Sequence, residues 1–192
     1  MLVSVSTAGA AGTLRVQVWR KLRSLGALYV QQSVCLLPDL PDVTREVRRL
    51  LDRVHHQGGS GRCWRIVFTE PGEERQAVAE LNAARDAEYA EVLERLPALR
   101  DELEQERARG RVTYAEVEES EADLERFRSW LAKIAARDYF DAPGGEAARA
   151  AIENAAAELA ALEQAALGAE SPAEPAPTEA GQPRALRMVD DE

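Results

Sequence analysis

The sequence predicts an α+β protein in three parts: a sheet domain at residues 1–70, a helical bundle at 71–167 and a disordered acidic tail at 168–192. Three observations support this division. The first part alternates short apolar strands with amphipathic helices. The second repeats apolar residues at heptad spacing. The third alternates proline with alanine and glutamate, a composition that buries too little apolar surface to offset the entropy of ordering.

The order of elements in the first part predicts a ferredoxin-like βαββαβ domain. Residues 26–38 hold two short apolar runs separated by Gln-Gln-Ser, which fits a tight hairpin better than one long strand. Strands are predicted before this hairpin at 2–6 and after it at 62–69, and a helix is predicted on each side of it. Strand, helix, hairpin, helix and strand in this order give a split βαβ sheet.

Local signals set the limits of the two helices of this domain. Thr13 is the predicted N-cap of the first helix and Gly26 its stop. Pro41 opens the second helix, and the glycine-rich segment 58–61 ends it as a flexible turn. The predicted buried positions are Leu14, Val18, Leu22 and Leu25 in the first helix, and Val43, Val47, Leu50, Leu51 and Val54 in the second.

Three heptad seams predict that the second part folds into an antiparallel three-helix bundle. Gly110 ends the first helix, Thr113 and Glu116 form a capping box that starts the next, and 138–145 is the second turn. Pro97 should kink the first helix. The seam residues are Tyr89, Val92, Leu96, Leu99 and Leu103; then Val117, Ser120, Leu124, Phe127, Leu131 and Ile134; then Ile152, Ala155, Leu159 and Leu162. The large aromatic residues Trp19, Trp64, Trp130, Tyr139 and Phe140 are expected to anchor packing, the last three by sealing the bundle against the sheet domain.

Charge separates the domains more clearly than the overall net charge of −10 suggests. Residues 1–69 hold ten Lys or Arg against four Asp or Glu, whereas residues 70–166 hold twelve against twenty-four. A basic head on an acidic stalk indicates that any polyanion would meet the head. The N-terminus lacks the pattern of a secretory signal, and no apolar run reaches membrane-spanning length. We therefore expect a soluble, cytoplasmic protein with no membrane partner.

No motif in the sequence predicts catalysis, a metal site or a cofactor. Cys35 and Cys63 are expected to be buried thiols on different strands, with the first strand between them. The neighbouring His55 and His56 end a helix and are expected to cap it rather than bind a metal. The first strand ends without a carboxylate, which argues against a metal-dependent nuclease. A redox role for Cys63 stays open as an enzymatic alternative.

Basic residues of the head give the main functional prediction, a phosphate-contacting surface for DNA. The candidate nucleic-acid-binding residues are Arg15, Arg20, Lys21 and Arg23 of the first helix. The wider basic set adds Arg45, Arg48, Arg49, Arg53, Arg62 and Arg65. The same residues could instead be solvated helix faces, some of them paired with the acidic stalk.

Two stretches of the sequence together resemble the N-terminal region of ChrB-type chromate-resistance proteins, over about residues 1–166. The first stretch also resembles the sheet domain of PaaX-type repressors. The first comprises residues 19–22, 25–27 and the hairpin ending at 36–38; the second comprises 113–119, 124–126, 130–134, 137–140 and 142–143. The C-terminal chromate-resistance domain of that family is expected after the third helix, where this sequence has the acidic Pro- and Ala-rich segment.

The resemblance implies a regulatory protein of chromate resistance, since full-length members act as chromate-responsive transcription regulators. We expect a homodimer, because a small ferredoxin-like sheet leaves edges and an open face to be covered. Two partners are considered: DNA, for a transcription regulator, and a separate chromate-resistance protein, for a scaffold that binds through its helices. Neither reading makes the protein an enzyme.

Overall fold

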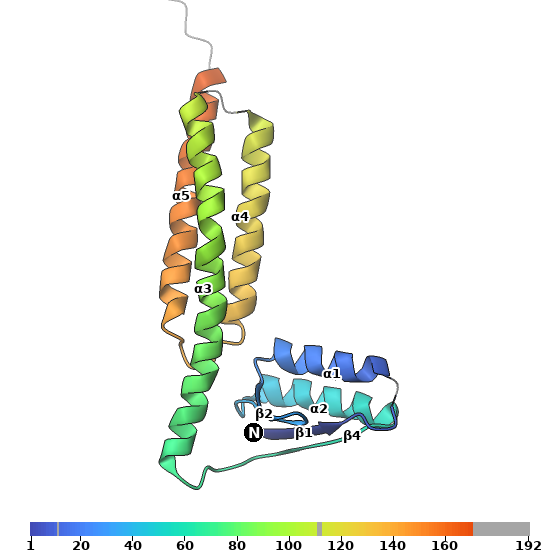
Figure 1. Ribbon diagram of the computed structural model, residues 1–192. Coiled ribbons are helices and arrows are strands. Elements are labelled where there is room, and N and C mark those ends of the chain that lie inside the picture. The colour runs from blue at the N-terminus through green and yellow to red at the C-terminus, as the bar shows by residue number, and fades with distance from the viewer. Residues whose placement is uncertain (11, 111–112, 171–192) are drawn as a thin grey trace, which may run out of the picture.

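The structure is a computed structural model, and it describes residues 1–10, 12–110 and 113–170. Within these residues the protein is α+β, as predicted, with five helices and a four-stranded antiparallel sheet. The sheet and two helices form a head at the foot of three long helices (Figure 1). The tail predicted to be disordered lies outside the described residues, apart from its first three positions.

The head follows the predicted order of elements. These are β1 (Leu2–Ser6), α1 (Gly12–Ser24), β2 (Leu28–Gln31), β3 (Val34–Leu36), α2 (Pro41–His56) and β4 (Ser60–Trp64). Across the sheet the strands lie in the order β2-β3-β1-β4, and all neighbours are antiparallel. β2 and β3 form the predicted hairpin, with an irregularity in the register between Tyr29 and Gln31.

The two cysteines lie on either side of the first strand, as predicted. Val3 of β1 pairs with Cys35 on β3 and with Cys63 on β4, and both cysteines are free. Val3 and Cys35 are almost completely buried, because this side of the sheet is covered by α1 and α2 (Figure 1). The predicted stripes of both helices pack here, with Leu25 at the margin of the core.

Three boundaries in the head differ from the predictions. α1 already includes Gly12, so Thr13 is not its N-cap. β4 begins at Ser60 and ends at Trp64, earlier at both ends than the predicted strand at 62–69. The segment predicted as a flexible turn therefore supplies two residues of a strand. A Cβ atom at Gly61 would lie 2.6 Å from Cδ2 of Leu51, so the close approach of α2 accounts for a glycine within this strand.

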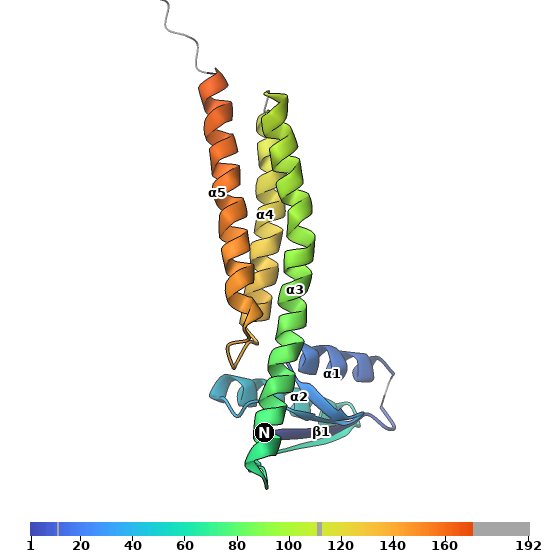
Figure 2. The same ribbon diagram turned by 60° about the vertical axis from the view of Figure 1, so that its left-hand side comes forward.

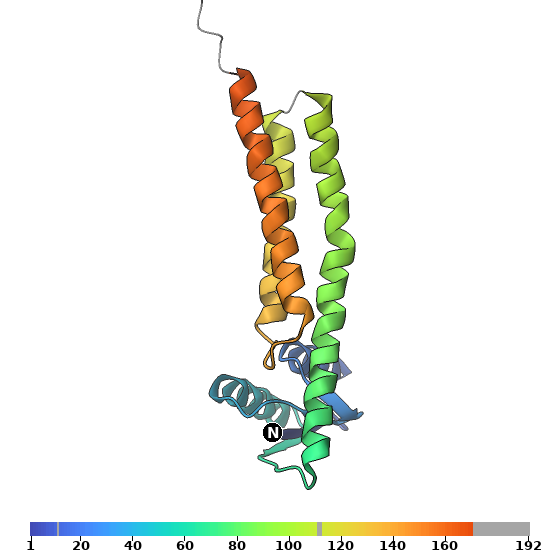
Figure 3. The same ribbon diagram turned by 90° about the vertical axis from the view of Figure 1, so that its left-hand side faces the viewer.

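Three helices extend from the head: α3 (Pro71–Arg109), α4 (Tyr114–Ala135) and α5 (Gly144–Glu170). Figures 2 and 3 show α3 passing the sheet and continuing alongside α4 and α5. α3 remains one helix through Pro97, which lies on the exposed side of the helix. α5 includes the first three residues that were assigned to the tail. No helix among the described residues is long and apolar enough to cross a membrane.

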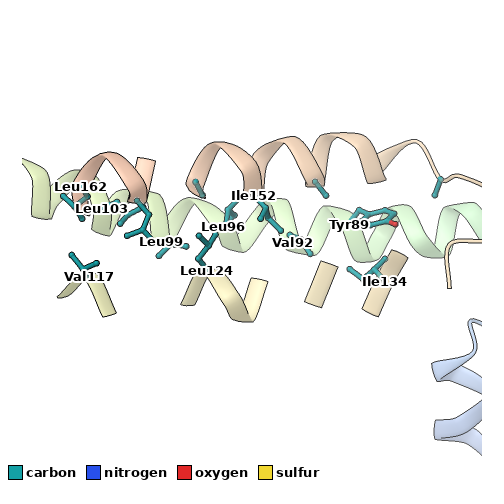
Figure 4. Close-up of a cluster of buried hydrophobic side chains, with 14 residues drawn as sticks. Tyr89, Val92, Leu96, Leu99, Leu103, Val117, Leu124, Ile134, Ile152 and Leu162 are labelled. Atoms are coloured by element: carbon teal, nitrogen blue, oxygen red, sulfur yellow. The ribbon is translucent and has the colours of Figure 1, made fainter. Parts of the chain in front are cut away.

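The predicted seams form the shared core of these three helices (Figure 4). All five seam residues of α3 and all four of α5 are buried; in α4, Phe127 and Leu131 are only partly buried. Gly110 ends α3 in the left-handed conformation. The capping box is confirmed, because Thr113 accepts from the backbone N–H of Glu116 and Glu116 accepts in return from that of Thr113.

The loop between α4 and α5, residues 136–143, connects the bundle to the head. Its Tyr139 packs against the core of the head and donates a hydrogen bond to the carbonyl oxygen of Leu25, 3.0 Å away. Asp138 holds the loop on α3 by accepting a 2.9 Å hydrogen bond from Tyr89. Tyr139 thus joins this loop to the head. Trp130 instead packs on the bundle core, where it stacks against Phe127 with ring centroids 6.3 Å apart.

A carboxylate between two arginines completes this junction. Glu88 of α3 accepts a 2.8 Å hydrogen bond from Arg137 of the loop and lies 3.3 Å from Nε of Arg85, which is only 8% exposed. Gly26, two residues after the end of α1, lies against the guanidinium of Arg85 and against the Cβ atom and the backbone carbonyl of Arg137. A Cβ atom on Gly26 would lie 2.8 Å from Nη1 of Arg85, and its φ of 73° also favours glycine. Glu88 therefore compensates two cations where bundle and head meet.

Replacement of Glu88 by alanine tests this junction. We expect Glu88→Ala to lower the free energy of unfolding by about 2–4 kcal/mol, because it leaves two mostly buried guanidinium groups without their carboxylate. Urea unfolding followed by circular dichroism measures the change.

Glu91→Ala is the matched control, since Glu91 lies one turn along α3 and pairs with Arg95 at an exposed position. Exposed pairs contribute about 0–1 kcal/mol. Equal losses of stability in the two variants would contradict the role assigned to Glu88.

Candidate nucleic-acid interface

The four candidate DNA-binding residues project from α1 in different directions. The buried stripe of α1, formed by Leu14, Val18 and Leu22, faces the sheet. Arg15 and Arg23 lie on one flank of this stripe together with Trp19, which is four residues from each. Arg20 is exposed on the outer side of the helix. Lys21 lies on the opposite flank, toward α2, so the structure does not bring all four together.

Lys21 is engaged within the head. Its Nζ lies 2.6 Å from Oε2 of Glu46 on α2, and Arg49 donates to the other oxygen of the same carboxylate at 2.7 Å. The hydrogen bond from Lys21, followed by that from Arg49, lowers the pKa of Glu46. Lys21 therefore helps to hold α1 against α2, and its charge is partly neutralised.

Arg15, Arg20 and Arg23 form no ion pair with any residue that the structure describes. The guanidinium of Arg23 lies over the indole of Trp19, 5.2 Å from the ring centroid. Arg15 lines a groove between α1 and the sheet. These three cations remain available to a phosphate backbone.

The rest of the basic set is divided between paired and unpaired residues. Arg45 pairs with Asp42 on α2, and Arg65 pairs with Asp39. No acidic partner is found in the described part of the chain for Arg48, Arg53 and Arg62. The carboxylates that do pair belong to the head and not to the acidic stalk. The wide basic surface predicted from the sequence is therefore reduced to isolated cations on several elements, with the α1 group beside an aromatic ring.

Two tryptophans predicted to be packing anchors are exposed. Trp19 is 47% exposed on α1, and Trp64 is 44% exposed at the end of β4. The spacing of Trp19 indicates an exposed side chain, because Trp19 falls between Arg15 and Arg23 and outside the apolar stripe of α1. For Trp64 the signal is the alternation along β4, where Trp64 lies on the same side of the strand as Ser60 and Arg62 and all three are exposed.

Comparison with known proteins identifies the family. The family model described as Protein ChrB, N-terminal, matches residues 15–170. The chain belongs to this family. It is also 27% identical over 103 residues to the Protein ChrB of Cupriavidus metallidurans strain CH34, a match that covers 54% of this chain and 31% of that protein. The chain thus matches about a third of the length of this relative. No solved structure matches the chain.

The buried cysteine and the two histidines of this ChrB-family chain have well-defined surroundings. Burial raises the pKa of Cys35 to about 11, so its thiol stays protonated near neutral pH. His55 and His56 bond to backbone groups of Gly61 and Asp52, at 3.0 and 2.6 Å. No group of three metal-ligating side chains is found among the described residues.

Alkylation distinguishes the two thiols. At pH 8 the folded protein should take up one iodoacetamide adduct, at the partly exposed Cys63, because Cys35 is 1% exposed and only about one thiol in a thousand would be ionised at a pKa of about 11. Intact mass spectrometry measures this.

Raising the pH toward 11 should increase the thiolate fraction of Cys35, and denaturant should give two adducts. Cys63→Ala should leave the folded chain unlabelled at pH 8. Rapid labelling of that variant would show that Cys35 is accessible and ionised.

Proposed function

We propose that the chain is a non-enzymatic, cytoplasmic regulatory protein of chromate resistance that binds DNA through the outer side of α1. Membership of the ChrB N-terminal family supports the pathway, since the relative in Cupriavidus metallidurans is named Protein ChrB. The observation that carries the DNA proposal is the group of exposed cations on α1, which no described carboxylate neutralises. Phosphate contacts from such cations supply most non-specific DNA affinity.

We further propose that the head is a ferredoxin-like domain and that α3, α4 and α5 form an antiparallel three-helix bundle. The strand order β2-β3-β1-β4 supports the first, because each βαβ unit is split by one strand. The shared apolar core supports the second. In a homodimer, the side of the sheet away from α1 and α2 would be available for contact with a second copy.

We propose a DNA footprint of Arg15, Arg20 and Arg23, without Lys21. Lys21 already shares a carboxylate with Arg49, so moving it to a phosphate would break a contact between α1 and α2. DNA is repelled by the bundle, because residues 70–166 carry twice as many acidic as basic side chains. The duplex would therefore approach α1 from the side away from the bundle.

Salt-dependent binding tests this function. Fluorescence anisotropy with a labelled duplex from upstream of its own gene should show affinity that falls steeply between low and physiological salt. Arg20→Ala and Arg23→Ala should each weaken binding about 3- to 30-fold and reduce the salt slope by about one. Lys21→Ala should weaken binding by less than either.

Arg126→Ala provides the control, since Arg126 is an exposed arginine on α4 that pairs with Asp123. Its affinity should match that of the unchanged protein. A binding curve insensitive to salt, or equal effects of Arg20→Ala and Arg126→Ala, would reject DNA binding by α1.

A second function, a scaffold that binds a separate chromate-resistance protein, is supported by one observation on the bundle. A groove of about 680 Å³ lies between α3 and α5, with Leu103 and Leu162 within it and Arg100 and Glu158 at its edge. A scaffold should co-purify with a protein partner and without DNA, and Arg20→Ala should leave that partner bound.

A further inference from the structure

A groove lies beside α1 in the head, and of the three residues in the proposed DNA footprint only Arg15 lines it. Its volume is about 690 Å³, within the range of sites for small molecules. α1 forms one wall with Arg15 and Trp19, and the hairpin forms another with Tyr29 and Ser33. Cys35 lies among the buried residues at its base.

Exposed apolar side chains gather in this groove. Val16 is 44% exposed, Trp19 47% and Tyr29 38%, and all three line it. Large apolar residues that are left exposed together commonly mark a binding site, whereas single ones need no explanation. Two of these three, Trp19 on α1 and Tyr29 on β2, are aromatic and offer faces to a flat ring.

The polar groups of the groove favour an anion. Arg15 is the one charged side chain in its lining within the described residues, and it has no ion-pair partner there. Serine, threonine and glutamine side chains supply the other polar groups: Ser6, Thr7, Gln32 and Ser33. The thiol of Cys35 is neutral at physiological pH, so it does not repel an anion. Arg23, which does not line the groove, places a further positive charge over the ring of Trp19.

We propose that this groove binds a small planar aromatic ligand that carries one anionic group, with the ring against Trp19 and Tyr29 and the anion on Arg15. The chemistry fits both an aryl carboxylate and a nucleoside monophosphate. The site does not require DNA binding, and it can be tested without DNA.

Isothermal titration of the full chain with 2-naphthoate and, separately, with AMP tests the proposal. At least one of them should bind with one-to-one stoichiometry and a Kd between about 10 μM and 1 mM. Binding of naphthoate alone assigns an aryl carboxylate, and binding of AMP alone assigns a nucleotide. Cyclohexanecarboxylate, which has the charge without the flat ring, and 2-naphthalenemethanol, which has the ring without the charge, should bind at least about tenfold more weakly.

Variants then locate the site. Arg15→Gln and Trp19→Ala should each weaken binding at least about tenfold. Arg20→Gln and Trp64→Phe should change it less than about twofold, since these residues lie on the same helix or are similarly exposed but do not line the groove.

Circular dichroism checks that the variants fold. If Trp19→Ala does not fold, the affinities of Arg15→Gln and Trp19→Phe are used to locate the site. Three results would each overturn the proposal. The first is that neither anion binds at a ligand concentration of about 5 mM. The second is that the uncharged or the non-planar compound binds as tightly as the planar anion, and the third is that Arg15→Gln and Arg20→Gln have equal affinity for it. Loss of DNA binding in the anisotropy experiment would leave this result unaffected, so the two proposals can fail independently.

Discussion

The arrangement of the whole molecule depends on the junction at which the loop between α4 and α5 lies between α3 and the end of α1. Head and bundle each have their own apolar core, and neither core extends into the other. Tyr139 and the Glu88 cluster connect them at the C-terminal end of α1. Gly26 permits this contact because a side chain there would meet Arg85. A buried ion cluster adds little net stability, but separating its charges is costly because each would stay buried without a partner. The cluster therefore favours one position of the bundle on the head.

This junction also determines which parts of α1 are available. The C-terminal end of the helix is held by the loop, one flank is held by Lys21 and Glu46, and the buried stripe is held by the sheet. What remains is the flank with Arg15, Trp19 and Arg23, and the outer side with Arg20. Recognition of a polyanion and of a small aromatic anion would both use this remaining surface, and Arg15 and Arg23 are common to both proposals.

Much of the fold could be predicted because its signals are local or periodic. The seam from Tyr89 to Leu103 is regular enough to define a buried face without tertiary information, and the capping box at Thr113 is a contact within one turn. The hairpin could be predicted because a polar turn separates two apolar runs. The start of β4 could not be predicted, because it depends on contacts between elements: Gly61 pairs with Val5 of β1 and leaves room for Leu51 of α2.

The functional surface was harder to predict for the same reason. Charge counts found the basic residues of the head, but they could not show that Lys21 turns toward Glu46 while Arg15 turns toward the hairpin. Arg85 resembles any other arginine of an acidic helix in the sequence, but it is buried where Gly26 and the loop between α4 and α5 pack against α3. Where three helices, strands or loops pack together, the exposure of a side chain depends on how they pack. No single stretch of sequence determines that packing.

The distance between α1 and α4 tests the central claim, that the junction holds the head in one position on the bundle. Spin labels at Arg20→Cys and Arg126→Cys, in a Cys63→Ser background with Cys35 buried, allow this distance to be measured by double electron–electron resonance. A single narrow distribution, broadened by Glu88→Ala and unchanged by Glu91→Ala, is the result we predict. A broad or multiple distribution in the protein with an intact Glu88 would contradict the account.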